Sequence, residues 1–370
     1  MKITRFSSVA ALGAVAALSL VGCAANEPAP GGGDESSAPS ESTLSGTIEA
    51  TGASSQETAQ SAWVAGFQTL NSGATVNYTS TGSGPGRDNF VAGSSDFIGS
   101  DRAFNADELA AGEFGSCATS SIVEIPVYIS PVAVAFNLEG VDELKLDGAT
   151  IAGIFAGEIT NWNDPAIADQ NPDVTLPDQP IVPVHRADDS GTQETFTNYL
   201  SSVAPDVWTW EADGVWPSDL GGEAADGTSG VVSAISEGSG YIGFADASQA
   251  GELGQVAVEV QGEYVEYSAE AASALVAASP LEEGREPQDL AFAVDPAAAP
   301  AGSYPIALVS YLIGCVEYED AEVAPLVKAY FEYVASEEGQ EASVEVAGNA
   351  PISEELRTQI MTAIDAIVTE

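Results

Sequence analysis

Three short stretches of the 370-residue chain place small hydroxyl residues and glycine where a helix is expected to begin. They are residues 51–57 (TGASSQE), 81–87 (TGSGPGR) and 186–193 (RADDSGTQ), and the last also carries Arg186. A helix N-terminus presents unpaired N–H groups and a positive dipole end, so it can hold an anion without lysines. Glycine lets the backbone come close, and serine or threonine hydroxyls add donors. Together, the three stretches predict a site for a small oxyanion.

Each stretch alone has a simpler interpretation, because serine at a helix start is usually only a cap. Ser54 with Glu57, and Ser190 with Gln193, have the spacing of a capping box. The presence of three such stretches in one chain favours a ligand site over capping alone.

The charge balance excludes several classes of partner. Nine Lys and Arg stand against 56 Asp and Glu, which gives a formal net charge of −47. Such a chain has too few cations to replace the counterions of a nucleic acid or to bind an anionic membrane through a basic patch. Exposed charges farther away than about 8–10 Å are screened at physiological salt. Hydrogen-bond donors in direct contact with an anion therefore outweigh the distant acidity.

Catalysis and metal binding find little support. The single histidine, His185, and the three cysteines exclude a multi-histidine metal site and a cysteine-rich cluster. A serine hydrolase using His185 and Ser190 is the enzyme alternative, but the two residues are five apart and no Gly-x-Ser-x-Gly elbow occurs. Residues 82–86 lack the lysine of a nucleotide-binding loop, and a metal phosphatase would need more histidines. We expect no enzyme activity and no cofactor.

The N-terminal residues have the pattern of an export signal. Lys2 and Arg5 precede an apolar run over residues 9–21, too short to span a membrane. The run ends in Leu-Val-Gly-Cys23, which resembles the bacterial lipoprotein box, so residues 1–22 are expected to be removed and Cys23 to receive lipid. A plain signal peptide cleaved elsewhere is the alternative. Residues 23–45 are expected to include a disordered tether rich in Gly, Pro, Ser and Glu. Cys117 and Cys315 then remain as a disulfide in an oxidising compartment, or as two separate thiols.

The body alternates short strand patterns with amphipathic helical ones, which predicts α/β layers with largely parallel sheets. The expected strands cover residues 46–50, 74–78, 96–99, 122–129, 132–136 and 305–313. The expected helices cover residues 56–70, 148–155, 192–200, 230–236, 322–336 and 353–368. If Cys117 pairs with Cys315, the C-terminal tail packs against the first segment. This gives a discontinuous first domain, residues 46–130 plus 302–370, and a second domain over residues 131–301.

Several motifs resemble the phosphate-binding protein of bacterial ABC phosphate importers, the PstS-type family. They are TGSG (81–84), GSD (99–101) and RADDSGT (186–192), with support from IAGIFAGEITNW (151–162) and GYIGF (240–244). The likeness extends over about residues 46–365. It implies the type II fold of periplasmic binding proteins, in which two α/β lobes joined by a two-strand hinge close over a ligand cleft. It also implies a lipid-anchored, monomeric receptor on the outer face of the cytoplasmic membrane, which captures inorganic phosphate for a membrane permease and its ATPase.

The resemblance implies a set of phosphate ligands: Ser54, Ser55, Ser83, Asp101, Arg186, Ser190, Gly191 and Thr192. Ser55 stands where many relatives have an aromatic residue, so its backbone N–H is the expected donor. Asp188 is expected to hold Arg186 in place, or else to form only a surface pair. Arg87 and Arg102 are interpreted as rim or structural charges.

Asp101 is the informative member of this set, although a solvated aspartate after a strand is the more common case. A carboxylate facing an anion is repulsive unless the anion carries a proton to donate. Phosphate does so at neutral pH and sulfate does not. This favours phosphate over the alternative oxyanions, sulfate and molybdate.

Overall fold

The computed structural model describes residues 44–369, which form a mixed α/β fold. The expected signal segment, Cys23 and residues 24–42 lie outside the described residues. No helix within residues 44–369 is both long enough and apolar enough to cross a bilayer.

Strands and helices alternate along the chain. The strands are β1 (Ser45–Gly52), β2 (Gly73–Ser80), β3 (Phe97–Ser100), β4 (Ile122–Asn137), β5 (Glu143–Leu146), β6 (Val182–Arg186), β7 (Glu223–Ala225), β8 (Tyr241–Asp246), β9 (Gly254–Val260), β10 (Glu263–Val265) and β11 (Ala307–Cys315). The helices are α1 (Glu57–Leu70), α2 (Ser83–Val91), α3 (Ala106–Ala111), α4 (Gly148–Phe155), α5 (Pro165–Ala168), α6 (Gly191–Val203), α7 (Gly227–Glu237), α8 (Ala247–Ala250), α9 (Ala269–Ala278), α10 (Ala324–Ala335), α11 (Glu337–Ala347) and α12 (Glu354–Ile364).

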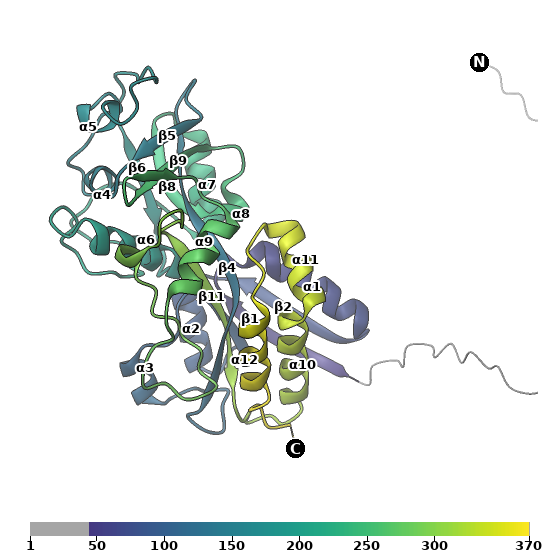
Figure 1. The fold of residues 1–370 in the computed structure, drawn as a ribbon. Coiled ribbons are helices and arrows are strands. Elements are labelled where there is room, and N and C mark those ends of the chain that lie inside the picture. Colours follow the sequence, from purple (N-terminus) through teal and green to yellow (C-terminus); the bar gives the residue numbers. More distant parts are fainter. Residues whose placement is uncertain (1–43, 370) are drawn as a thin grey trace, which may run out of the picture. The chain divides into compact units, whose positions relative to one another are not determined.

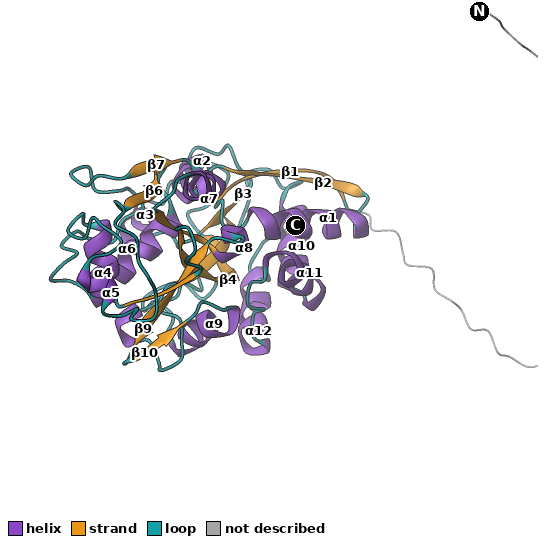
Figure 2. Ribbon diagram, turned by 90° about the horizontal axis from the view of Figure 1, so that it is seen from above, coloured by secondary structure: helices purple, strands orange, loops and turns teal. Residues whose placement is uncertain are grey.

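The strands form one path in the order β2-β1-β3-β11-β4-β8-β6-β7, with β9 also beside β4 and flanked by β5 and β10. Helices lie on both sides of the strands (Figure 2). The pairs β1/β2, β1/β3, β5/β9, β6/β8 and β6/β7 are parallel, whereas β4 and β11 are antiparallel to all their neighbours. The expectation of largely parallel sheets is therefore wrong at the centre. Strand β11 returns from the C-terminal part of the chain and is inserted between β3 and β4 (Figure 1).

Strand β4 links two groups of strands: the first consists of β1, β2, β3 and β11, and the second of β5 to β10. Its residues 122–131 pair with β11, and from Val132 onward it pairs with β8 and β9. The sequence predicts two separate strands here, over residues 122–129 and 132–136, with Pro131 between them; proline has no N–H to donate to a ladder. Pro131 lies where β4 changes partner, so the strand continues through it. All residues of β4 before Asn137 are buried.

The C-terminal helices cover the first group of strands. Helices α10 and α11 lie next to α1, and α12 packs against β4 (Figure 1). Trp63 of α1 is fully buried, and its indole N–H donates to the carbonyl of Gly339 in α11. A disulfide joins Cys117 to Cys315, the last residue of β11. The tail thus completes the layer that begins with β1.

Candidate functional site

Asp101 follows the buried strand β3 and is itself buried, with three hydroxyl groups on its carboxylate. Ser55 and Ser310 each donate to Oδ1 at 2.6 Å, and Thr192 donates to Oδ2 at 2.8 Å. The three donors come from the loop before α1, from β11 and from the first turn of α6. Asp101 is therefore a hydrogen-bond acceptor at a point where three distant segments meet, and not a solvated surface residue.

The N-terminus of α6 lies directly against Asp101. A Cβ atom added at Gly191 would lie 2.5 Å from the Cβ of Asp101 and 3.0 Å from the hydroxyl of Ser83. Ser83, the first residue of α2, accepts from the backbone N–H of Asp101 at 3.1 Å. The N-termini of α2 and α6 thus both lie beside the Asp101 carboxylate. Glycine at 191 is what allows this approach.

Arg186, the last residue of β6, is buried and bound at two positions by Asp188. Its Nε donates to Asp188 Oδ1 at 2.8 Å, and its Nη2 pairs with Asp188 Oδ2. Asp188 Oδ1 also accepts from the N–H of Gly227 at 3.2 Å. Gly82 packs against the same carboxylate with a φ of +98°, where a side chain would be strained and would collide with Asp188. Asp188 therefore contacts the buried guanidinium through both of its carboxylate oxygens.

Ser54 does not cap α1, although its spacing to Glu57 predicts this. Helix α1 begins after Gln56, and no side chain caps it. The Ser54 hydroxyl instead lies 3.0 Å from that of Thr228 and accepts from the Thr228 N–H at 3.1 Å. The contact joins residues 174 positions apart, so a tertiary contact with α7 has replaced the local cap.

Ser190 does cap α6, since its hydroxyl accepts from the Gln193 N–H. The other half of the capping box is absent, because the Gln193 side chain accepts from Arg186 N and donates to the Gly214 carbonyl. These bonds tie the helix start to the end of β6, so Arg186 and the first N–H groups of α6 are held together.

A cavity of about 280 Å³ adjoins these residues. It is lined by Ser54, Glu57, Ser80, Thr81, Asp188, Asp226, Gly227 and Ser229. The Thr81 hydroxyl is buried and has no hydrogen-bond partner among the described residues. It is a further donor close to the site.

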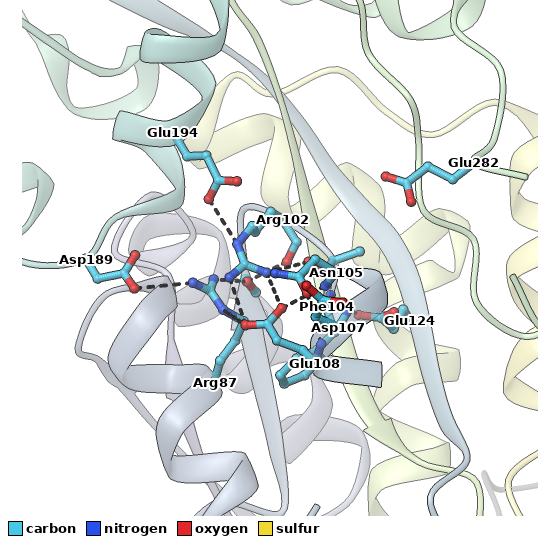
Figure 3. Close-up of polar contacts among 12 residues, drawn as sticks. Arg87, Arg102, Phe104, Asn105, Asp107, Glu108, Glu124, Asp189, Glu194 and Glu282 are labelled. Carbon is cyan, nitrogen blue, oxygen red and sulfur yellow. Dashed lines mark hydrogen bonds and ion pairs between the residues drawn. The ribbon is translucent and has the colours of Figure 1, made fainter. Parts of the chain in front are cut away.

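Arg87 and Arg102 make ion pairs across the site (Figure 3). Arg102 Nε lies 3.0 Å from Glu194 of α6, and Arg87 Nη2 lies 3.5 Å from Asp189. Both arginines also pair with Glu108. Both arginines therefore join residues 87–108 to residues 189–194. Their role is structural, because these ion pairs connect the first group of strands to the second.

Burial acts on the pKa values of these ion pairs. Burial lowers the pKa of Arg87, with a smaller contribution from Arg102, and raises that of Glu194. Burial also opposes the ionisation of Arg102 and Glu108, but the hydrogen bonds between these two side chains outweigh the effect of burial. The pKa of Arg102 is therefore raised, and that of Glu108 is lowered.

The His185 ring contacts an aromatic side chain and a backbone carbonyl. The ring stacks on Trp216, with centroids 4.8 Å apart and 6° between the planes, and its Nδ1 lies 2.9 Å from the Arg186 carbonyl. Burial lowers its pKa. The described residues contain no hydrogen bond between His185 and Ser190, so the pair is not arranged as a hydrolase requires.

The structure thus brings Ser55, Ser83, Asp101, Gly191 and Thr192 into one set of contacts. Arg186 with Asp188, Ser190 as the cap of α6, and Ser54 with Thr228 adjoin this set. Ser310 and Thr228 are not predicted by any sequence motif. Ser310 lies inside an apolar strand, where only its polarity marks it, and Thr228 follows Asp226-Gly227 at the start of α7.

Comparisons with known proteins identify relatives over most of the chain. A family model described as a PBP superfamily domain matches residues 37–338. Phosphate-binding protein PstS 3 of Mycobacterium tuberculosis (strain ATCC 25618 / H37Rv) is 33% identical, over 99% of this chain and 100% of its own length. Phosphate-binding protein PstS of Pasteurella multocida (strain Pm70) is 31% identical, over 85% of this chain and 88% of its own.

The solved structure of a high-affinity periplasmic phosphate-binding protein, PfluDING, bound with phosphate, has a TM-score of 0.71. It is 23% identical, over 85% of this chain and 93% of its own. The mixed α/β fold is that of the type II periplasmic binding proteins. The chain belongs to the phosphate-binding protein PstS family.

Proposed function

We propose that this protein is an extracytoplasmic receptor that captures inorganic phosphate and delivers it to an ABC importer. The observation that carries the proposal is the position of Asp101, an acceptor-only carboxylate packed against the N-terminus of α6. The helix start attracts an anion through its unpaired N–H groups. The Asp101 carboxylate accepts hydrogen bonds, so an anion binds beside it only if that anion carries a proton to donate.

The proposed ligands are those expected from the family motifs. Donors come from Ser54, the Ser55 N–H, Ser83, Arg186, Ser190, and the Gly191 and Thr192 ends of α6, while Asp101 accepts. The Thr81 hydroxyl joins them, since it is buried beside the same residues and has no hydrogen-bond partner within residues 44–369. Asp188 keeps the guanidinium plane in position, so Arg186 can offer parallel donors to two oxygens.

Two lobes would close over the ligand. We assign residues 46–130 plus 302–370 to the first lobe and residues 131–301 to the second, with β4 crossing between them at its change of partner. The contacts of Thr192, Asp189 and Glu194 with the first lobe then belong to the closed form. Residues 288–290 also pair with Glu124 of β4, so this part of the second segment stays attached to the first lobe. A ligand that contacts both lobes stabilises the closed form.

The anchor and the transporter complete the proposal. Lipid on Cys23 would hold the monomeric receptor at the outer face of the cytoplasmic membrane, and a permease with its ATPase would receive the phosphate. Mass spectrometry of the purified protein tests the anchor. A diacylglyceryl adduct on Cys23 supports it, whereas cleavage at another residue without lipid contradicts it.

Calorimetric titration with phosphate, sulfate and molybdate tests the binding function. We expect tight binding of phosphate, at micromolar concentration or below, and at least about tenfold weaker binding of the other two anions. Sulfate or molybdate bound as tightly as phosphate would favour the alternative oxyanions. Turnover of p-nitrophenyl phosphate would favour an enzyme.

A further inference from the structure

A chain of buried hydrogen bonds leads from the C-terminal helices to Asp101. The Tyr330 hydroxyl donates to Gln60 Oε1 at 2.7 Å, and Gln60 Nε2 donates to Gln56 Oε1 at 2.8 Å. Gln56 Nε2 then donates to the Ser310 hydroxyl at 2.6 Å, and Ser310 donates to Asp101 Oδ1 at 2.6 Å. Each of the four residues before Asp101 is at most 1% exposed, so water does not compete for these bonds.

The direction of this chain is set by a backbone carbonyl. Gln56 Nε2 also donates to the carbonyl oxygen of Tyr311 at 3.0 Å. A carbonyl can only accept, so the amide of Gln56 must present its NH₂ group to both Tyr311 and Ser310. Because the Ser310 oxygen accepts from Gln56, the single Ser310 proton is directed to Asp101.

We propose that Gln56 and Ser310 are specificity-determining positioning residues that hold Asp101 as an acceptor, so that the site selects a protonated oxyanion. The inference rests on the proposed phosphate site and adds two residues that are not among its ligands. Ser310 and Ser55 together occupy Oδ1. The carboxylate is thereby oriented with Oδ2, the oxygen that accepts from Thr192, toward the start of α6.

The directed proton matters for discrimination between anions. A carboxylate free to rotate could turn away from sulfate, which would relieve the unpaired contact between two acceptors that excludes this anion. The hydroxyl proton that Ser310 donates to Oδ1 opposes this rotation.

The first experiment compares Ser310→Ala with Ser343→Ala. Ser343 is also fully buried, and its hydroxyl donates to the Gln340 carbonyl outside this chain of bonds. The readout is the ratio of the dissociation constants for sulfate and phosphate, measured by calorimetry on the full-length protein. We expect Ser310→Ala to lower this ratio about tenfold and Ser343→Ala to leave it unchanged. An unchanged ratio in Ser310→Ala, or an equal fall in both variants, would overturn the proposal.

The second experiment separates the positioning role of the Gln56 amide from the contribution of the Gln56 side chain to packing. Gln56→Met keeps the length of the side chain but loses the directing amide. Gln340→Met is its matched control, because Gln340 is equally buried and donates to the Val127 and Val334 carbonyls. Both changes should lower the thermal stability, but only Gln56→Met should lower the sulfate-to-phosphate ratio. A fall in both, or in neither, would contradict the role of Gln56.

Ser310→Thr supplies the conservative rescue. It keeps the hydroxyl, so we expect it to retain most of the wild-type discrimination. A loss as large as that of Ser310→Ala would mean that the hydroxyl is not the determinant. Failure of the proposed function is distinguishable, because the wild-type protein itself would then not prefer phosphate.

Discussion

The Thr192 hydroxyl donates to Oδ2 of Asp101 at 2.8 Å, although 91 positions separate the two residues in the chain. Thr192 belongs to the first turn of α6, and Asp101 follows β3, so the bond crosses between the two groups of strands. The bond holds the start of α6 directly against the Asp101 carboxylate. In the proposed site, a ligand beside this bond would have donors from both groups of strands and one acceptor, Asp101.

Gly191 permits this approach, and Gly191→Ala should prevent it. The new Cβ would lie 2.5 Å from the Cβ of Asp101, a distance at which the helix must move away. We expect phosphate affinity to fall at least about tenfold, because the start of α6 and the Asp101 carboxylate can no longer meet. Gly221→Ala is the control, since nothing lies within 4 Å of its Cβ position. Equal affinities for both variants would show that the contact is not required.

The Arg102–Glu194 pair should stabilise the ligand-bound form. The two side chains are 22% and 30% exposed and lie 3.0 Å apart, so their coupling is limited by solvent. A double-mutant cycle with Arg102→Gln and Glu194→Gln should give a coupling of about 0.5–1 kcal/mol in phosphate affinity, which salt weakens.

Lys328→Gln is the control for this cycle. Lys328 pairs with Asp365 away from the site, and its loss should not affect phosphate affinity. A coupling of zero at low salt would show that the Arg102–Glu194 pair contributes nothing to closure.

Asp246 should make stability depend on pH. It is fully buried opposite Val132, and burial raises its pKa to about 6. An unfolded aspartate titrates near pH 4, so between about pH 4 and 6 the folded form retains a proton that the unfolded form loses. The contribution of Asp246 is therefore complete below about pH 4 and decreases by up to about 3 kcal/mol as the pH rises through 6.

The measurement is urea unfolding of the wild type and Asp246→Asn between pH 4 and 7. The difference in free energy of unfolding, wild type minus variant, should decrease with pH in this window. A difference that is constant with pH would show that Asp246 titrates normally in the folded protein.

The Cys117–Cys315 disulfide closes a loop between residues 198 positions apart. It restricts the unfolded chain more than the folded one. Replacing both cysteines by serine should therefore lower the free energy of unfolding by about 2–5 kcal/mol. Phosphate affinity should stay within a few-fold of the wild type, because the bond lies at the far end of β11 from the site. Reductant should destabilise the wild type and leave the variant unaffected, and equal stability of the two proteins would contradict this account.

Local patterns predicted much of the fold. The apolar period of residues 148–155 matches α4 (Gly148–Phe155), and β1, β2 and β3 lie where alternation or β-branched residues indicate strands. Helix starts at Ser83 and Gly191 were predicted by glycine and hydroxyl residues, whose effect is local. The family motifs then pointed to Asp101 and Arg186 as members of one site, which stays a prediction.

Contacts between distant segments could not be predicted in this way. Ser310 donates to Asp101 from 209 positions away, and no motif surrounds it. Ser54 has the spacing of a cap, but its pairing with Thr228 prevails over the local bond. The insertion of β11 between β3 and β4 is likewise a property of the whole chain, and it makes the sheet antiparallel at its centre.

The most direct test of the central claim is a calorimetric titration of the wild type and of Asp101→Asn with phosphate and with sulfate. The Asn side chain can donate, so it should accept sulfate where the carboxylate rejects it. We predict that the wild type prefers phosphate strongly and that Asp101→Asn lowers this preference by about tenfold or more. A variant that keeps the wild-type preference, or a wild type that binds sulfate as tightly as phosphate, would contradict the account.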